Sequence, residues 1–191
     1  MTVRAMRLFT GLSLTATALL QADEILTELR TTADLRWSPL SNLHITTAFI
    51  GQWDEARLED LKTALAGLPQ PGPIPITLRG FGFFPNPHHP STLFLAVKPE
   101  PALSALAQGI ETALATLGQP REDRPYHPHV TLARIARENI VQLRFRIASM
   151  QNIFPLATFE ATAFHLYESR PTQGASVYNT LATFPLTAGA N

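Results

Sequence analysis

Three stretches of the chain repeat apolar residues at the spacing of an α-helix. In the first stretch the apolar residues recur at steps of four, three and four positions, with charged residues between them. These apolar positions are Ala18, Ala22, Ile25 and Leu29. We predict a helix over 15–31, a second that begins near Asp54, whose side chain can cap it, and a third that begins at Pro101 and ends at Gly118.

Other stretches alternate apolar and polar residues, which is typical of half-buried strands, and clusters of Pro and Gly separate them. The predicted strands cover 6–14, 42–50, 76–84, 93–97, 129–134, 159–167 and 177–185. The segment 137–151 is ambiguous, because its apolar residues alternate as they would in a strand. The repeat described next leads us to assign this segment to a helix.

The predicted elements occur twice in the same order. Each half has a helix, a strand that begins at a histidine (His44 or His129), a second helix and two further strands. The first of the two further strands begins 32 and 30 residues after these histidines, and the second begins 48 residues after each. Matching periods indicate two structurally similar halves, at about 15–98 and 101–185, within a single domain over 1–191.

Both halves carry a histidine with a threonine two positions later. The pairs are His44 with Thr46 and His129 with Thr131, and an apolar residue separates the two members of each pair. Side chains repeat every two residues along a strand, so each strand presents an imidazole beside a hydroxyl on one face. By composition roughly 0.7 such triplets are expected by chance, so it is the second copy at the equivalent place that makes the pattern informative.

Two imidazoles with two hydroxyls suit general acid–base catalysis. Imidazole titrates near neutrality, so one ring can accept a proton from water while the other donates one to a leaving oxygen. The threonine hydroxyls can donate hydrogen bonds to anionic oxygens and stabilise charge that develops in the transition state. A phosphodiester fits this arrangement, and a strained 2′,3′-cyclic phosphate fits it well, because its hydrolysis needs no metal.

Composition narrows the possible functions. The chain has 191 residues, 45% hydrophobic and 16% charged, and its formal net charge is zero, which argues against binding long nucleic acids by charge alone. The absence of cysteine excludes disulfides, thiolate zinc sites and cysteine nucleophiles. Thirteen of the fifteen basic residues are arginines, and one group forms either a local anion site or a solvated face. That group is Arg121, Arg124, Arg134, Arg137, Arg144 and Arg146.

The N-terminal apolar stretch superficially resembles a secretory signal. Threonines interrupt it, and the residues beyond it continue as the charged amphipathic helix predicted above. No run approaches the roughly 20 apolar residues that span a bilayer. We therefore expect a cytoplasmic protein with no membrane partner.

Four segments resemble the two-histidine (2H) phosphoesterase superfamily, and within it the RNA 2′,3′-cyclic phosphodiesterases, also called 2′-5′ RNA ligases. The segments are RLFTGLSL, NLHITTAFIG, PHVTLAR and LYESRPTQGASVYNTLATFPL. The resemblance implies a bilobal α+β fold with a duplicated β-α-β-α-β unit and antiparallel sheets around a central cleft. It also implies opening of a terminal 2′,3′-cyclic phosphate to a 2′-phosphate with no metal and no cofactor.

The resemblance further implies roles for individual residues. His44 and His129 would be the catalytic pair, usually acid and base in that order, and Thr46 and Thr131 would bind the phosphate. Phe49 matches an aromatic that stacks on the terminal base, and Arg134 matches an arginine near the phosphate. Strict strand alternation places Phe49 and Arg134 on the face opposite the histidines, so either each strand ends or bulges before them, or these two assignments fail.

The predicted partners are RNA 3′ ends or nucleoside 2′,3′-cyclic phosphates, bound by a monomer. Three alternatives use the same cleft. They are 2′-5′ RNA ligation, hydrolysis of a small-molecule cyclic phosphate such as ADP-ribose cyclic phosphate, and RNA-end binding without catalysis. The sequence fixes neither the physiological substrate nor which histidine is the acid.

Overall fold

The computed structural model describes residues 4–122, 124–136, 140–173 and 176–187. The strands within these ranges are β1 (Ala5–Ser13), β2 (Arg36–Trp37), β3 (His44–Asp54), β4 (Ile74–Phe84), β5 (Thr92–Val97), β6 (His129–Arg134), β7 (Ala157–Ala161), β8 (Ala163–Pro171) and β9 (Ser176–Pro185). The α-helices are α1 (Ala16–Arg30), α2 (Leu58–Ala66), α3 (Pro101–Thr116) and α4 (Val141–Ser149). Short 3-10 helices lie at Leu40–Asn42, Glu55–Arg57 and Gln151–Ile153.

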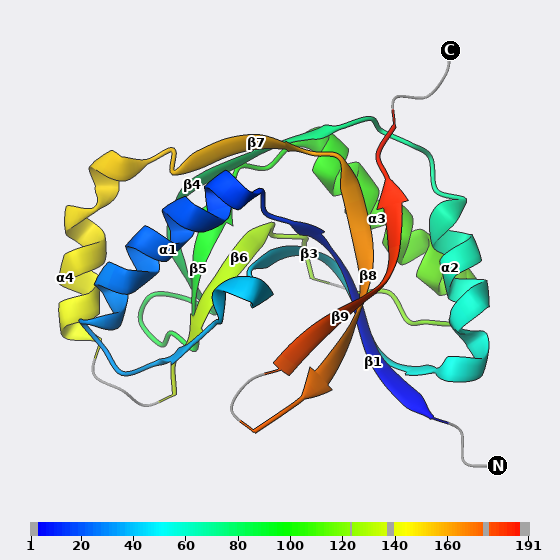
Figure 1. Ribbon diagram of the computed structural model, residues 1–191, viewed down its shortest axis with the longest axis horizontal. Coiled ribbons are helices and arrows are strands. Elements are labelled where there is room, and N and C mark those ends of the chain that lie inside the picture. Colours follow the sequence, from blue (N-terminus) through cyan, green and yellow to red (C-terminus); the bar gives the residue numbers. More distant parts are fainter. Residues whose placement is uncertain (1–3, 123, 137–139, 174–175, 188–191) are drawn as a thin grey trace.

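The strands form one curled antiparallel sheet in the order β7-β4-β5-β6-β3-β1-β8-β9 (Figure 1). The short strand β2 pairs with β6 outside this order. The pair Ile45↔Val130 joins β3 to β6, whereas the neighbouring strands pair over longer stretches. The sheet therefore consists of two groups of four strands with a narrow connection at its centre.

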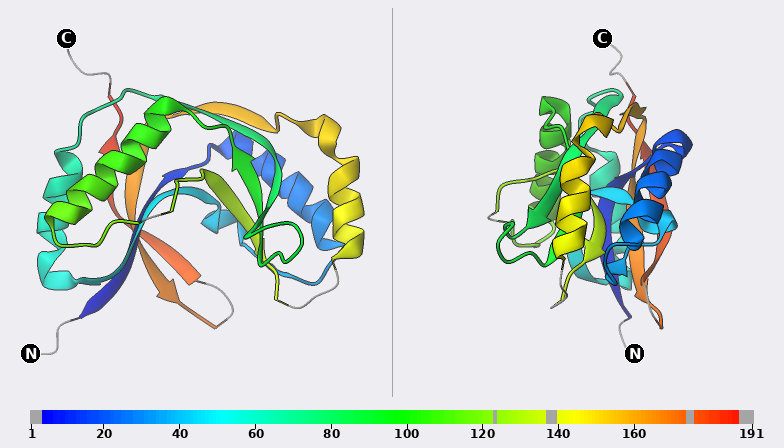
Figure 2. Two further views of the ribbon diagram at one scale, coloured as in Figure 1. Left: turned by 180° about the vertical axis from the view of Figure 1, so that it is seen from behind. Right: turned by 90° about the vertical axis from the view of Figure 1, so that its left-hand side faces the viewer.

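The helices cover the two strand groups separately. Helix α1 contacts β7 and α4, while α3 contacts β3 and α2. Figures 1 and 2 show α1 and α4 at one end of the molecule and α2 and α3 at the other. Each helix that precedes a histidine strand thus covers the group to which that strand does not belong, so the predicted halves interleave in space.

The buried apolar residues form one hydrophobic cluster beneath the helices and the sheet. Leu26 and Leu29 of α1 and Leu61 and Leu65 of α2 are fully buried, as their helical spacing predicts. Asp54 accepts a hydrogen bond from the Ala56 amide at 2.8 Å and so caps the turn that leads into α2. These contacts confirm the sequence-based assignment of the first two helices.

The ambiguous segment before residue 151 is helical from Val141 onward, as the repeat predicts, and residues 137–139 lie outside the described ranges. Its alternating pattern contains two residues at helical spacing, Leu143 and Ile147. The helix buries these two and leaves Val141 and Phe145 exposed. The helix prediction is confirmed. The alternating pattern is compatible with a helix because every second residue of the pattern is enough to form the buried face.

One expectation about the strands is wrong. The strand predicted over 159–167 is interrupted at Thr162 and forms the separate strands β7 and β8, which pair with β4 and β1 respectively. Strand β9 lies at the sheet edge, whereas its counterpart in the repeat, β5, lies beside β6. Strand β1 lies beside β3.

The predicted α+β fold class with antiparallel strands is confirmed, with the refinement that one continuous sheet replaces separate sheets. The predicted domain organisation stays a prediction. In the described part of the chain, no helix is long and apolar enough to cross a membrane.

Candidate active site

His44 is the first residue of β3, and its imidazole has a defined orientation. Its Nδ1 lies 2.7 Å from the carbonyl oxygen of Asn42. A carbonyl oxygen only accepts hydrogen bonds, so Nδ1 carries a proton and Nε2 is the nitrogen that can exchange one. This Nε2 lies 2.9 Å from the Thr46 hydroxyl, so the predicted imidazole and hydroxyl are in direct contact.

His129, the first residue of β6, is held in the same way. Its Nδ1 donates to the carbonyl oxygen of His127 at 2.7 Å, and its Nε2 is therefore the exchanging nitrogen. In both strands the accepting carbonyl belongs to the residue two positions earlier. The same local hydrogen bond thus gives both imidazoles the same tautomer.

The central pair Ile45↔Val130 brings the two motifs together. Both of these side chains are fully buried, so the residues on either side of them face the opposite surface of the sheet. Antiparallel pairing around this point directs His44 toward Thr131 and His129 toward Thr46. The structure therefore places the two imidazoles and the two hydroxyls side by side on one face.

Aromatic side chains support each imidazole. The ring of His44 lies 4.8 Å from the ring of Phe9 and makes an edge contact with Tyr178 at 5.3 Å. The ring of His129 lies 4.9 Å from Phe84 and 5.3 Å from Phe94, both at edge-on angles. These contacts limit the rotation of both rings and remove part of their surface from water.

Burial is the main cause that lowers the pKa of both histidines from the ordinary 6.5. For His44, the hydrogen bond to the Asn42 carbonyl opposes this shift, and the charge of His129 adds to it. For His129, the bond to the His127 carbonyl opposes the shift, while the positive charges of Arg134 and His127 lower its pKa further. The charge of His129 thus acts on the pKa of His44, so the two imidazoles interact electrostatically.

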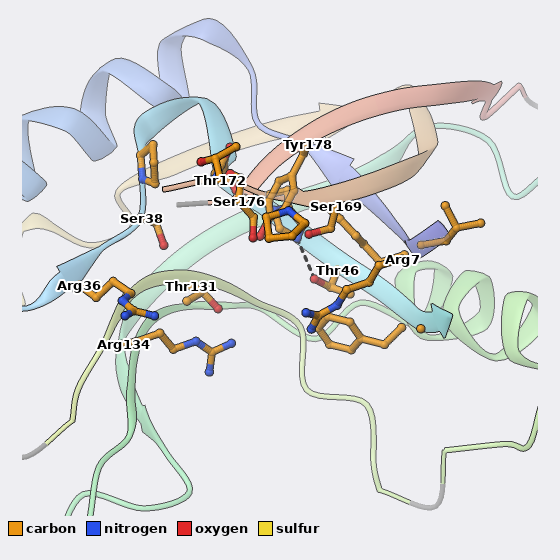
Figure 3. A pocket seen from close by; sticks show the side chains of 18 of the residues that line it. Arg7, Arg36, Ser38, Thr46, Thr131, Arg134, Ser169, Thr172, Ser176 and Tyr178 are labelled. Carbon is orange, nitrogen blue, oxygen red and sulfur yellow. Dashed lines mark hydrogen bonds between the residues drawn. The ribbon is translucent and has the colours of Figure 1, made fainter. Parts of the chain in front are cut away.

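A cavity of about 730 Å³ opens beside these residues, and we call it the cleft. His44, Thr46 and Thr131 line it, and Figure 3 shows both threonine side chains directed into it from neighbouring strands. His129 is half-buried between its aromatic neighbours and does not belong to the cleft wall.

Phe49 and Arg134 also line the cleft, so of the alternatives left open by strand alternation the structure shows the one in which each strand bulges first. The reason is an extra residue in each strand. In β3 the register skips Thr47, and in β6 it skips Leu132, three positions after the respective histidine. Each irregularity reverses the alternation that follows it and brings the later residue to the face of the histidines.

The extra residue in β3 has its own hydrogen-bonding partner. The Thr47 hydroxyl lies 2.7 Å from the Thr10 hydroxyl, and both side chains are buried. Phe49 is 68% exposed, which is unusual for a phenylalanine and leaves its ring open to a ligand in the cleft. Arg134 donates to the Thr92 hydroxyl at 2.7 Å, which fixes one edge of its guanidinium group.

Sequence reasoning missed other residues of the cleft wall. They are Arg7 and Arg36, whose guanidinium groups approach from different sides, and Tyr178, which contacts His44 (Figure 3). Within the described residues the wall contains no aspartate or glutamate. The cleft is therefore positively charged, although the chain has no net charge. The excess of arginine over lysine was the sequence signal that could have indicated these residues.

Most of the predicted arginine group lies elsewhere. Of its described members, only Arg134 lines the cleft. Arg124 pairs with Glu122, Arg146 pairs with Glu28, and Arg144 donates to the Pro87 carbonyl. Arg137 lies outside the described residues.

The curled antiparallel sheet and the paired histidine strands define a protein of the two-histidine phosphoesterase type. A model of the 2′-5′ RNA ligase superfamily matches residues 19–173. The chain belongs to this superfamily. The family and the expectation of an enzyme, both predicted from the sequence, are thereby confirmed.

Relatives and solved structures agree with this assignment. A protein of Archaeoglobus fulgidus named RNA 2′,3′-cyclic phosphodiesterase is 29% identical over 182 residues, which cover 94% of this chain and 99% of the relative. A Methanocaldococcus jannaschii protein of the same name is 30% identical over 141 residues, covering 73% and 78%. The crystal structure of TT0787 of Thermus thermophilus has a TM-score of 0.75 and 27% identity, covering 95% and 98%.

Escherichia coli LigT complexed with 3′-AMP has a TM-score of 0.76 and 22% identity, and covers 97% of this chain and 100% of LigT. At this identity the likeness concerns the fold. It places the curled sheet of this chain among the folds of the superfamily.

Proposed function

We propose that this protein is a cyclic phosphodiesterase that opens a terminal 2′,3′-cyclic phosphate to a 2′-phosphomonoester. The observation that carries the proposal is the matched pair of imidazoles, each held through Nδ1 by a carbonyl two residues earlier, beside a cationic cleft. The names of the relatives support the same substrate class, because those proteins are RNA 2′,3′-cyclic phosphodiesterases.

The proposed reaction needs one neutral and one protonated imidazole. The neutral ring takes a proton from water, and the water oxygen forms a bond to phosphorus. The bond between phosphorus and the 3′ oxygen breaks, and the protonated ring donates its proton to that oxygen. The product has a 3′ hydroxyl and a 2′-phosphate, and the proton count balances with water as the co-reactant.

Charges around the two rings favour His44 as the acid and His129 as the base. Arg134 is permanently charged and lowers the pKa of His129, whereas His129 itself is the charged neighbour that lowers the pKa of His44. The charge of Arg134 therefore favours the neutral form of His129 that a base needs, while burial lowers the pKa of both rings. This order agrees with the assignment that the family resemblance implies.

The other cleft residues would bind the substrate. Thr46 and Thr131 can donate hydrogen bonds to the non-bridging phosphate oxygens, where negative charge increases in the transition state. Arg134 can neutralise the same phosphate with a guanidinium edge that Thr92 orients. The exposed ring of Phe49 can stack on a terminal base without selecting its identity.

The test is hydrolysis of adenosine 2′,3′-cyclic phosphate by the wild type and by the His44→Ala and His129→Ala variants. In each variant kcat should fall by about 10²–10⁴-fold, which is the usual contribution of a general acid or base. His88→Ala is the matched control, because His88 is an exposed histidine outside the cleft and should leave the rate unchanged.

Chromatography against 2′- and 3′-phosphate standards identifies the product. Retained turnover in either cleft variant with an unchanged fold would refute the acid–base assignment. Binding of the cyclic phosphate without conversion would show that the protein only recognises RNA ends. Ligation is measured by adding an oligonucleotide with a 5′ hydroxyl and looking for a joined product.

A further inference from the structure

Two arginines face each other at one end of the cleft. In the short β2–β6 ladder Arg36 pairs with Arg134, and both side chains line the cleft (Figure 3). Like charges directly opposite each other on neighbouring strands destabilise a sheet. A pair of guanidinium groups kept in this arrangement indicates a site for an anion between or above them.

The position of Arg36 is built by its neighbours. The Ser38 amide donates to the Leu132 carbonyl at 2.8 Å, and Leu132 is the extra residue that brings Arg134 into the cleft. The Trp37 indole donates to the Ala33 carbonyl at 3.3 Å, and Leu35 is buried in the core. The irregularity in β6 thus sets the location of both arginines.

In the described part of the chain, no carboxylate neutralises either arginine. Among the described residues neither one forms an ion pair, and the neighbour that accepts a hydrogen bond from Arg134 is the uncharged Thr92. The cleft wall supplies no carboxylate either, as described above. Two positive charges therefore remain available to a ligand.

Arg36 lies beside the end of β6 that is far from His129. Its pairing partner Arg134 is the last residue of β6, and His129 is the first. The cleft volume of about 730 Å³ is within the range of about 300–1,000 Å³ that small-molecule ligands occupy, so it has room for more than one phosphate. Arg36, on the outer strand, can therefore contact a second phosphate while Arg134 still approaches the first.

We propose that Arg36, next to Arg134, binds a second phosphate of the substrate, the one attached to the 5′ oxygen of the terminal nucleoside. This inference rests on the proposed function and narrows its substrate class. The enzyme acts on nucleotides and RNA ends with a 5′-linked phosphate in preference to a nucleoside that has the cyclic phosphate alone. Arg36 is a specificity-determining residue for that preference.

The experiment compares two substrates that differ by one phosphate. These are adenosine 2′,3′-cyclic phosphate and its 5′-phosphorylated form, measured with the wild type and with Arg36→Gln. We expect the wild type to prefer the 5′-phosphorylated form by about five- to tenfold in kcat/KM, as an exposed charge-assisted contact would give. Arg36→Gln should remove most of this preference, mainly through KM, and Arg36→Lys should retain part of it.

Arg7→Gln is the matched control for loss of one positive charge from the cleft. Arg7 lies near Thr46, across the cleft from the arginine pair (Figure 3). This variant should lower kcat/KM for both substrates alike and keep their ratio. A ratio that changes in Arg7→Gln and not in Arg36→Gln would place the second phosphate on the other side and overturn the inference.

The outcomes separate this inference from the proposed function. If the wild type hydrolyses neither substrate, the proposed function fails. If it hydrolyses both with equal kcat/KM, the cyclic phosphodiesterase stands and the second-phosphate site is wrong. If Arg36→Gln lowers both values by the same factor, Arg36 does not distinguish the second phosphate and the inference is overturned.

Discussion

Gly11 offers a direct test of how closely the sheet positions His44. It lies on β1 opposite Thr46, and a β-carbon added to it would lie 2.8 Å from the Ile45 carbonyl oxygen and 3.3 Å from Cδ2 of His44. The first distance is shorter than real β-carbon contacts, and its partner is backbone rather than a flexible side chain. Gly11→Ala must therefore move β3 relative to β1 by a few tenths of an ångström.

The expected effects of Gly11→Ala follow from where this shift occurs. Ile45 forms the central pair with Val130, so its displacement changes the placement of His44 relative to His129. Overpacking of this kind costs about 1–3 kcal/mol in the free energy of unfolding. Since a misplacement of about 1 Å can reduce catalysis about 100-fold, a smaller shift should lower kcat about tenfold.

The assay measures urea unfolding and hydrolysis of adenosine 2′,3′-cyclic phosphate for Gly11→Ala and for Gly80→Ala. Gly80 is the matched control, because an added β-carbon there meets no atom within 4 Å. The control should change the free energy of unfolding by less than about 1 kcal/mol and leave kcat unchanged. Wild-type stability and rate in Gly11→Ala would refute the reasoning, because the contact that it depends on would then be absent.

Three further predictions concern the pH profile of the reaction, the pH dependence of stability and the extra residue in β3. Because burial lowers both imidazole pKa values below 6.5, the bell-shaped pH profile of kcat/KM should have its maximum below pH 6.5, and a maximum above pH 7 would contradict this. Neutral His44 is favoured by folding, so the free energy of unfolding should fall as the pH is lowered below 6.5, and should fall less in His44→Asn. Thr47→Val leaves the buried Thr10 hydroxyl without its partner and should cost about 1–3 kcal/mol. The double variant Thr10→Val/Thr47→Val should cost less than the sum of the single changes in urea unfolding, and strict additivity would show that the two hydroxyls do not interact.

The site also explains why a neutral chain can act on an anionic substrate. The positive charge needed for phosphate is gathered in the cleft wall as Arg7, Arg36 and Arg134, whereas acidic residues pair with arginines elsewhere, as Glu28 does with Arg146. Net charge describes the whole surface, but binding depends on the local field. The composition therefore excluded binding by overall charge without excluding a local site.

The sequence by itself determined the elements and the chemistry that they carry. Apolar periodicity located the helices, and the two histidine–threonine pairs located the strands of the site, because both signals depend on neighbours along the chain. The roles of His44 and His129 remain predictions, yet their position at the start of equivalent strands was readable from spacing alone.

Only the tertiary structure decided which later residues join the histidines and what surrounds them. Phe49 and Arg134 enter the cleft because β3 and β6 each contain an extra residue, and pairing between strands, not the pattern within one strand, creates that irregularity. In the same way, the two-residue strand β2 is too short to have a periodic pattern. The place of Arg36 in the cleft is therefore recognised only from the pairing of β2 with β6. Strand alternation is a local rule, and contacts between segments far apart in the chain determine where it is broken.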